Sequence, residues 1–324
     1  IGTLVIVPAA GVTHAASGIG EAGLDGIPML IISGGIHSDS PYRYQLHDID
    51  QHTLLKPITK ATFRIASHKE VIPTLYEAYR IATGGEPGPV FVELPYNIGN
   101  FLGEVDEMPP FQKAVAAPDL DRDALYEAAR LLVNAKRPGL FLGWGAAQAE
   151  LVRLAELLDA PACTTLQGLS AFPGNHPLHV GMGFGDYAVP AAANAFAGCD
   201  CLLAVGTRFS EIPTGSYSMP VPDCLIHVDI NPEVFNANFP ARITLEGDAA
   251  QIIPALLREV EALQPAPRRG MAERIRADKA AYRQEWLKHD SKDRVNPAHF
   301  FGELRSQLDD EAIVVADDGN HTFL

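Results

Sequence analysis

The fold of this chain follows from the stretch Gly84-Gly85-Glu86-Pro87-Gly88-Pro89-Val90-Phe91-Val92-Glu93-Leu94-Pro95. Glycine and proline dominate its first half, and they favour tight turns because glycine adopts left-handed backbone angles and proline presets φ. Residues 90–92 are β-branched or aromatic, which is typical of a strand, and Pro95 closes the run. By itself the stretch predicts only a turn that leads into a buried strand.

Several short motifs precede this turn in a defined order. They are Gly11-Val12-Thr13-His14, Gly18-Ile19-Gly20-Glu21-Ala22, Asp25-Gly26-Ile27-Pro28, the apolar run Met29-Leu30-Ile31-Ile32-Ser33-Gly34, Asp48-Ile49-Asp50-Gln51 and Ile58-Thr59-Lys60. In this order and at this spacing they resemble the pyrimidine-binding domain of thiamine-diphosphate enzymes of the acetolactate synthase, pyruvate oxidase and benzoylformate decarboxylase group. The resemblance covers essentially the whole chain.

Composition restricts the class of protein. The 324 residues are enough for two or three domains. A formal net charge of -15 without a Lys/Arg-rich cluster argues against nucleic acid or an anionic membrane as partner, since both need basic residues. No apolar run reaches the roughly 18 residues of a membrane span, and no signal peptide is recognisable, so we expect a cytoplasmic enzyme. The cysteines lack CxxC and zinc-site spacings, which predicts free buried thiols at Cys163, Cys199, Cys201 and Cys224.

Hydrophobic patterns predict an α/β protein with consecutive doubly wound parallel sheets. In the first hundred residues, strand-like runs at 4–7, 29–33 and 90–94 alternate with a helical pattern at 70–83. A second alternation begins with a helix around Leu125 and closes with a helix at 249–263. Its expected strands lie at 140–142, 162–165, 201–205 and 225–229, a doubly wound pattern of about six strands in scale.

Composition changes mark two linkers, at 108–123 and 264–270. With the resemblance, they divide the chain into a partial pyrimidine-binding domain (1–107), a central Rossmann-like domain (120–263) and the start of a diphosphate-binding domain (271–324). Helices are expected at 271–289 and from Asn296-Pro297-Ala298, followed by a buried strand at 312–317. We expect the first and third domains to be incomplete, because a lone strand and two helices cannot cover a sheet edge.

Residues 318–321, Asp-Gly-Asn-His, follow that last expected strand. Taken alone, they read as a strand-terminating turn. The resemblance implies instead the first loop of the diphosphate-binding domain, with Gly319, Asn320 and His321 as thiamine diphosphate contacts. Backbone N–H groups and polar side chains of this kind suit a dianion.

The middle domain has a weak glycine signature. Gly143-x-Gly145 lacks the third glycine of a dinucleotide fingerprint and the acidic residue about 20 positions later, so a helix-entry turn is an equal explanation. The resemblance implies FAD or ADP, with Arg208 at the diphosphate or flavin ring and Asp229 at ribose hydroxyls. A long loop at 181–185 leaves flavin occupancy open. The implied contacts are Gly143, Gly145, Thr165, Leu166, Gly206, Thr207, Arg208, Asp229, Ile230, Asn231 and Asp248.

Two departures from the family pattern lie in the first domain. His47, in Leu46-His47-Asp48, replaces a glutamine that faces the reaction centre in acetolactate synthases and pyruvate oxidases, and a histidine there could move protons near neutral pH. It reads equally as a surface-loop histidine. Ala9-Ala10-Gly11 replaces the usual Gly-Pro-Gly, so that Gly11 alone remains for close approach to the pyrimidine.

The resemblance implies a thiamine-diphosphate and Mg²⁺-dependent enzyme that decarboxylates a 2-oxo acid and joins the product to a second carbonyl, as acetolactate synthase does. Pyruvate-oxidase-like and benzoylformate-decarboxylase-like activities are alternatives, and a non-catalytic nucleotide-binding module is an alternative of another class. The family's activating glutamate and metal-binding motif do not match these 324 residues, since Glu21 and Glu93 are not at the catalytic position. We therefore expect this stretch to be inactive alone, and the whole enzyme to be a homodimer or homotetramer.

Overall fold

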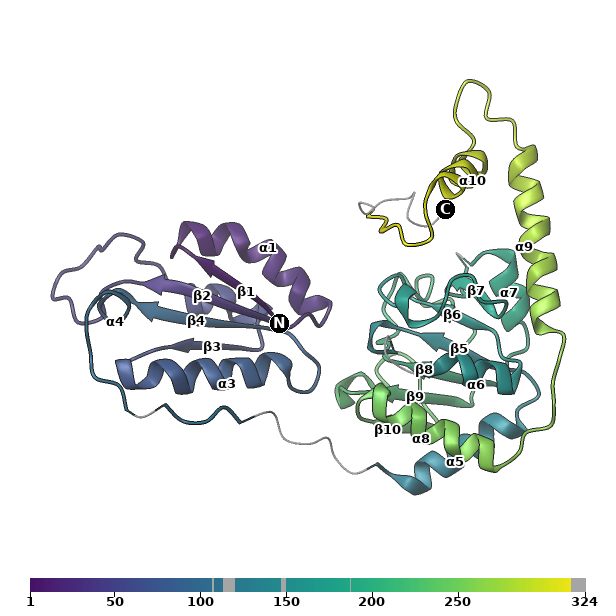
Figure 1. The fold of residues 1–324 in the computed structure, drawn as a ribbon, viewed down its shortest axis with the longest axis horizontal. Helices are drawn as coiled ribbons and strands as arrows, with labels where there is room; N and C mark the ends of the chain where they lie inside the picture. Colours follow the sequence, from purple (N-terminus) through teal and green to yellow (C-terminus); the bar gives the residue numbers. More distant parts are fainter. Residues whose placement is uncertain (107, 113–119, 147–149, 187, 316–324) are drawn as a thin grey trace. The chain divides into compact units, whose positions relative to one another are not determined.

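The computed structural model describes residues 1–106, 108–112, 120–146, 150–186 and 188–315. The chain divides into two compact units, residues 1–116 and 117–324, and each has its own parallel sheet (Figure 1). The boundary between the units falls within residues 108–123. Both sheets contain parallel pairs and alternate with helices, which confirms the predicted α/β doubly wound fold class.

The first unit contains four strands in the order β1-β2-β4-β3. Its strands are β1 (Gly2–Ile6), β2 (Met29–Gly35), β3 (Ala61–Arg64) and β4 (Pro89–Pro95), and its helices are α1 (Ala10–Leu24), α2 (Gln51–Leu55), α3 (Val71–Thr83) and α4 (Tyr96–Asn100), with short 3₁₀ turns at Lys56–Ile58 and His68–Glu70. Helices α1 and α3 lie on opposite faces of the sheet (Figure 1).

Side-chain alternation along the central strands produces the two cores of this unit. Val90 and Val92 of β4 pack with α3, whereas the intervening Phe91 packs with α1. This is the period-2 geometry of a strand buried on both faces. The turn that precedes β4 is held by Lys60, whose ammonium donates to the carbonyl oxygens of Ile81, Gly84 and Glu86 at 2.6, 2.7 and 2.7 Å.

The second unit contains a six-stranded sheet in the order β10-β9-β8-β5-β6-β7. The strands are β5 (Pro138–Leu142), β6 (Ala162–Thr164), β7 (His179–Met182), β8 (Cys201–Val205), β9 (Leu225–Asp229) and β10 (Ile243–Glu246). From β5 the chain winds outward to β7, returns to β8 beside β5, and winds outward again to β10. The direction of winding therefore changes between β5 and β8, and this switch point is where open α/β sheets bind ligands.

The helices of this unit are α5 (Arg122–Asn134), α6 (Leu151–Leu158), α7 (Pro190–Phe196), α8 (Ala249–Ala262), α9 (Met271–Lys288) and α10 (Pro297–Gln307), with 3₁₀ turns at Trp144–Ala146, Leu169–Ala171 and Pro232–Val234. Helix α5 packs on α8, and α7 packs on α9. The helix expected around Leu125 is α5, and its apolar face is buried. Helix α10 begins as expected, with Asn296 Oδ1 accepting from the N–H groups of Ala298 and His299.

The structure corrects one predicted strand and adds three. Residues 312–315 form no strand, and the side chains of Ile313 and Val315 are 91% and 90% exposed, because no strand in the described residues pairs with them. Residues 316 and 317 lie outside the described residues. Strands β3, β7 and β10 were not predicted, since each is only four residues long and mixes polar and apolar residues or contains glycine.

The four cysteines are free thiols. Burial raises the pKa of Cys199 to about 12 and holds the pKa of Cys163 well above its usual value, so these thiols stay protonated and unreactive. Among the described helices, none is long and apolar enough to cross a membrane.

Candidate functional site

The predicted glycines lie together at the switch point of the central sheet. Gly143 and Gly145 follow β5, and Gly206 follows the adjacent β8. The Gly143 N–H donates to the Val205 carbonyl at 2.9 Å, and the Gly145 N–H donates to the Gly206 carbonyl at 3.3 Å. The loops after β5 and β8 are thus joined backbone to backbone at the carboxyl edge of the sheet.

The two loops can approach this closely only because these three residues are glycines. A Cβ on Gly143 would lie 2.0 Å from the Gly206 oxygen, and one on Gly206 would lie 2.4 Å from the Gly145 Cα. Gly206 also has a positive φ of 58°, which other residues adopt only with strain. The space left by the missing side chains is therefore filled by neighbouring backbone at the switch point, which is where open α/β sheets have their ligand crevice.

Thr165 and Leu166 follow β6 on the other side of β5. The Thr165 N–H donates to the Leu142 carbonyl at 2.8 Å, and its hydroxyl accepts from the Gly168 N–H at 2.9 Å. Thr165 is buried, and Leu166 is half-buried. The hydroxyl of Thr165 therefore holds the turn after β6.

The predicted polar residues occupy the ends of β8, β9 and β10. Asp229 is 8% exposed, and its carboxylate accepts from the Asn231 N–H at 2.9 Å, while Ile230 between them is exposed. Asn231 in turn accepts from the Glu233 N–H. Asp248 follows β10 and caps α8 by accepting from the Ala250 N–H at 2.9 Å. Each side chain thus fixes the loop that leaves its strand.

His227, the third residue of β9, was not predicted as a site residue. It is 1% exposed and donates from Nε2 to the Thr207 carbonyl at 2.8 Å. Desolvation lowers its pKa, so the ring stays neutral at physiological pH. Through this bond His227 fixes the loop in which Thr207 is buried and Arg208 is exposed.

The residues at this switch point are of types that suit a nucleotide. Strands β5, β8 and β9 are neighbours, so the glycine loops and the Asp229 carboxylate lie at one edge of the sheet. An acidic residue at the end of a strand near a glycine turn suits ribose hydroxyls, and an exposed guanidinium such as Arg208 suits a diphosphate. No group of three or more metal-ligating side chains occurs among the described residues.

In the first unit, Gly11 and His47 lie on separate segments. Gly11 is the second residue of α1, and a Cβ there would lie 2.9 Å from the Val7 side chain, so the glycine permits a close local contact. His47 is half-buried in a turn with a φ of 66°, and its carbonyl accepts from the Ile49 N–H. Gly319, Asn320 and His321 lie outside the described residues.

A buried polar cluster at the carboxyl edge of the first sheet was not predicted. Its centre is Glu93 on β4, whose side chain is 4% exposed and accepts from Arg64 Nε at 2.8 Å and from Gln51 Nε2 at 3.1 Å. His52 Nε2 lies 3.2 Å from the same carboxylate, without the alignment of a hydrogen bond. Gly35 leaves room for it, since a Cβ there would lie 2.7 Å from Glu93 Oε1.

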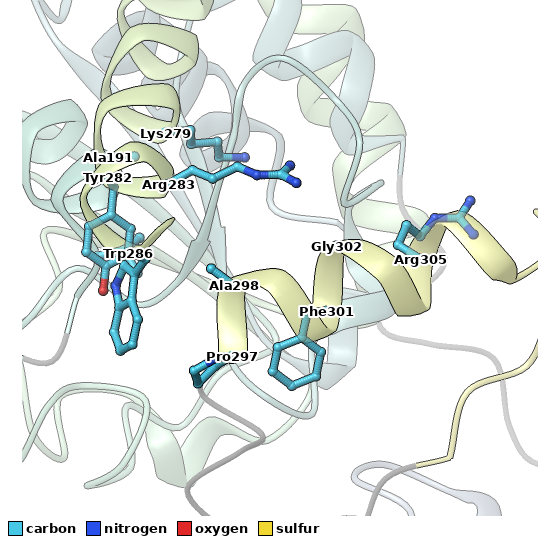
Figure 2. Close-up of a pocket in the computed structure, with 11 residues that line it drawn as sticks. Ala191, Lys279, Tyr282, Arg283, Trp286, Pro297, Ala298, Phe301, Gly302 and Arg305 are labelled. Carbon is cyan, nitrogen blue, oxygen red and sulfur yellow. The ribbon is translucent and has the colours of Figure 1, made fainter. Parts of the chain in front are cut away.

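A separate cavity of about 450 Å³ lies between α7, α9 and α10. Figure 2 shows that the rings of Tyr282 and Trp286 on α9 and of Phe301 on α10 line it, together with the cationic side chains of Arg283 and Arg305. None of the predicted site residues contributes to this cavity.

Comparisons with known proteins agree with this geometry. Residues 125–256 match the family model described as thiamine pyrophosphate enzyme, central domain. The chain is 35% identical over 286 residues to a probable acetolactate synthase large subunit of Methanocaldococcus jannaschii, which covers 85% of this chain and 48% of that protein. It is 32% identical over 260 residues to the acetolactate synthase isozyme 2 large subunit of Escherichia coli, and the match covers 79% of this chain and 47% of that protein.

A third relative, the acetolactate synthase large subunit of Corynebacterium glutamicum, is 30% identical over 274 residues, which are 81% of this chain and 43% of that protein. The chain thus spans about half the length of the curated relatives that it matches. The matched central domain coincides with the six-stranded sheet and its switch-point crevice. The chain is similar to acetolactate synthase large subunits, and its residues 125–256 match the central domain of thiamine pyrophosphate enzymes.

Proposed function

We propose that the protein containing this chain is a thiamine-diphosphate and Mg²⁺-dependent enzyme that decarboxylates a 2-oxo acid and transfers the product to a second carbonyl compound. The observation that carries the proposal is the central-domain match over residues 125–256, within a chain whose relatives are named acetolactate synthase large subunits. Cytoplasmic location and assembly into a homodimer or homotetramer are part of the same proposal.

Thiamine diphosphate supplies, when bound, the carbon centre at which a 2-oxo acid loses CO₂. On this proposal the start of α1, with Gly11, approaches the pyrimidine ring, and Gly319, Asn320 and His321 contact the diphosphate. The fit of the first turn rests on its place at the carboxyl edge of a parallel sheet, where α/β folds bind ligands. His47 is proposed to face the substrate, where its imidazole would transfer a proton.

The central crevice is proposed to bind FAD or ADP. Its support is the juxtaposition of the glycine loops after β5 and β8 with the buried Asp229 carboxylate after β9. Gly143, Gly145, Gly206 and Thr207 would form the floor, Asp229 would accept from ribose hydroxyls, and Arg208 would meet the diphosphate. Thr165, Leu166, Ile230, Asn231 and Asp248 would border the nucleotide.

The activity is tested with the protein at its natural full length. Purified protein freed of cofactors should release CO₂ from pyruvate, and form a carboligation product, only after thiamine diphosphate and Mg²⁺ are returned. Turnover that is indifferent to thiamine diphosphate would refute the assignment. The three-domain division is tested by limited proteolysis, which should cut within residues 108–123 and 264–270.

Nucleotide binding is tested by calorimetry with FAD and with ADP on Asp229→Asn, which preserves the acceptor for the Asn231 N–H while removing the charge. We expect affinity to fall about tenfold, the loss of one charge-assisted hydrogen bond. The matched control is Asp121→Asn, the N-cap of α5, whose carboxylate likewise accepts from a nearby backbone N–H, that of Ala124. Equal affinity of Asp229→Asn and wild type would remove Asp229 from the site.

A further inference from the structure

Ala9 has a backbone conformation that alanine rarely adopts. It lies between β1 and α1 with φ 55° and ψ -87°, and it is the N-cap of a helix that has no side-chain cap. Positive φ is costly for a residue with a Cβ and persists only when the surroundings enforce it.

The Ala9 N–H donates a hydrogen bond to Oε1 of Gln51, at 3.2 Å. Gln51 is 2% exposed, and its side chain uses its whole capacity for hydrogen bonds. Oε1 also lies 3.2 Å from the Ser33 hydroxyl, while Nε2 donates to the Gly34 carbonyl and to Glu93 Oε2, both at 3.1 Å.

This arrangement fixes which way the amide faces. Glu93 is an acceptor in its ionised form, and Arg64 donates to its other oxygen at 2.8 Å. Nε2 of Gln51 must therefore face Glu93, and Oε1 must face Ala9. In the reverse orientation the amide nitrogen of Gln51 would face the Ala9 N–H, donor against donor, and its oxygen would face the Glu93 carboxylate, acceptor against acceptor. The ion pair on β3 and β4 thus orients an acceptor toward the turn before α1.

The turn is confined from a second direction. A Cβ on Gly34, near the end of β2, would lie 3.3 Å from Cδ of Pro8. The carbonyl of Ala9 accepts from the Thr13 N–H at 2.9 Å, which joins the left-handed residue to the first turn of α1. The conformation of Ala9 therefore sets the direction in which α1 leaves the carboxyl edge of the sheet.

We propose that Gln51 is a positioning residue: by holding Ala9 in its left-handed conformation, it shapes the first turn of α1 for the pyrimidine ring of the cofactor. The cofactor half of this inference rests on the proposed function. Gln51 acts through Ala9 and has no catalytic role of its own, since its four hydrogen-bonding positions are occupied within the protein.

The test compares Gln51→Leu with Thr53→Val in the full-length protein. Thr53 is on the same helix α2 and donates to Asp50 at 2.6 Å without touching Ala9, so it controls for general loosening of α2. Gln51→Leu should raise the thiamine diphosphate concentration for half-maximal activity about tenfold, the effect of one lost hydrogen bond, with a smaller change in saturated rate. Gln51→Met is the second variant if Gln51→Leu does not fold.

Hydrogen exchange of the free protein provides a readout independent of activity. The Ala9 amide should exchange at least about tenfold faster in Gln51→Leu than in wild type or Thr53→Val, because its acceptor is gone. Adding Ala9→Gly to Gln51→Leu should recover part of the cofactor affinity, since glycine adopts a positive φ without a partner.

The outcomes separate the inference from the function on which it rests. A wild type that ignores thiamine diphosphate would overturn the proposed function and the cofactor half of the inference, while exchange would still decide whether Gln51 holds Ala9. A normal cofactor requirement in Gln51→Leu, unchanged exchange at Ala9, or no recovery with Ala9→Gly would overturn the positioning role.

Discussion

Two strand-end turns of this molecule meet similar geometric demands by different means. In the central unit, the loops after β5 and β8 touch because Gly143, Gly145 and Gly206 have no side chains. In the first unit, the residue after β1 that needs a positive φ is Ala9, and Gln51, 42 residues away in sequence, holds it there. The close contact in the central unit depends on residues without side chains, whereas the turn in the first unit depends on a buried network of hydrogen bonds.

The difference has consequences for stability. A loop built from glycines tolerates no added carbon, because backbone atoms already fill the space. A turn held by a polar network tolerates changes at the turn itself but depends on each member of the network being paired. The two turns should therefore respond in opposite directions to exchanges between glycine and alanine.

The largest effect is expected from Gly143→Ala. Its new Cβ would meet the Gly206 carbonyl oxygen at 2.0 Å, and both are backbone, so the loops must separate. We expect the free energy of unfolding of the central unit to fall by about 3 kcal/mol or more, at the upper end of overpacking costs. Chemical denaturation, followed by circular dichroism, measures it.

The control for this substitution is Gly174→Ala. An added Cβ at Gly174 meets nothing within 4 Å, and its φ is not in the positive range. It should leave the unfolding midpoint nearly unchanged. If both variants unfold at the same denaturant concentration, the close approach of the loops does not limit the central unit.

The second prediction concerns acid, because the central sheet contains buried neutral histidines where the first sheet contains an ion pair. Burial, followed by the nearby Lys279, lowers the pKa of His179 from 6.5 to about 4. Between pH 6.5 and pH 4, His179 therefore binds a proton in the unfolded state but not in the folded state. The contribution of the buried neutral ring to the free energy of unfolding is fully present above pH 6.5 and is lost as the pH falls toward 4. At pH 4.5 the loss is about 2 to 3 kcal/mol.

This acid sensitivity is checked with His179→Gln, which lacks a titrating group. Denaturation curves at pH 7 and pH 4.5 should differ less in His179→Gln than in wild type. Burial also lowers the pKa of His227, so the stability of His179→Gln should still fall at low pH, but by less than that of wild type. Parallel curves for the two proteins at both pH values would contradict the role of His179.

The third prediction tests the polar network of the first unit. Glu93→Ala removes the acceptor of Gln51 Nε2 and the partner of Arg64, and it should lower the stability of this unit by about 1 to 3 kcal/mol. Glu77→Ala is the matched control, since Glu77 also pairs with an arginine but lies on the exposed face of α3. Loss of stability in Glu77→Ala equal to that in Glu93→Ala would mean that burial of the carboxylate is unimportant.

The sequence predicted the glycine-built turn better than the network-built one, and the reason is physical. Glycines at 143, 145 and 206 are visible as a pattern, because their function is local to the residue type. The pairing of Gln51 with Ala9 depends on β2, β4 and α2 meeting in three dimensions, and no spacing in the chain encodes it. Site roles carried by tertiary contacts, such as that of His227, were missed for the same reason.

Among the elements, long buried strands were predicted and short mixed ones were not. Strand β4 is buried along almost its whole length, and its first four residues, 89–92, are continuous apolar sequence. The edge strands β7 and β10 are four residues each and contain His179 or Glu246, so their patterns resemble loops. The expected strand at 312–317 fails over 312–315 because strand propensity without a pairing partner does not produce a strand.

The smallest effect, and the sharpest contrast between the two turns, is expected from Ala9→Gly. Glycine removes the cost of a positive φ, about 1 to 2 kcal/mol, but adds conformational freedom to the unfolded chain that offsets about 0.4 to 1 kcal/mol. The net result should be a gain of about 0.5 kcal/mol, detectable as a small rise in unfolding midpoint. Ala10→Gly, one residue later and helical, should instead lose about 0.5 to 1 kcal/mol. A loss in both variants would mean that Ala9 is unstrained and that Gln51 merely accompanies its conformation.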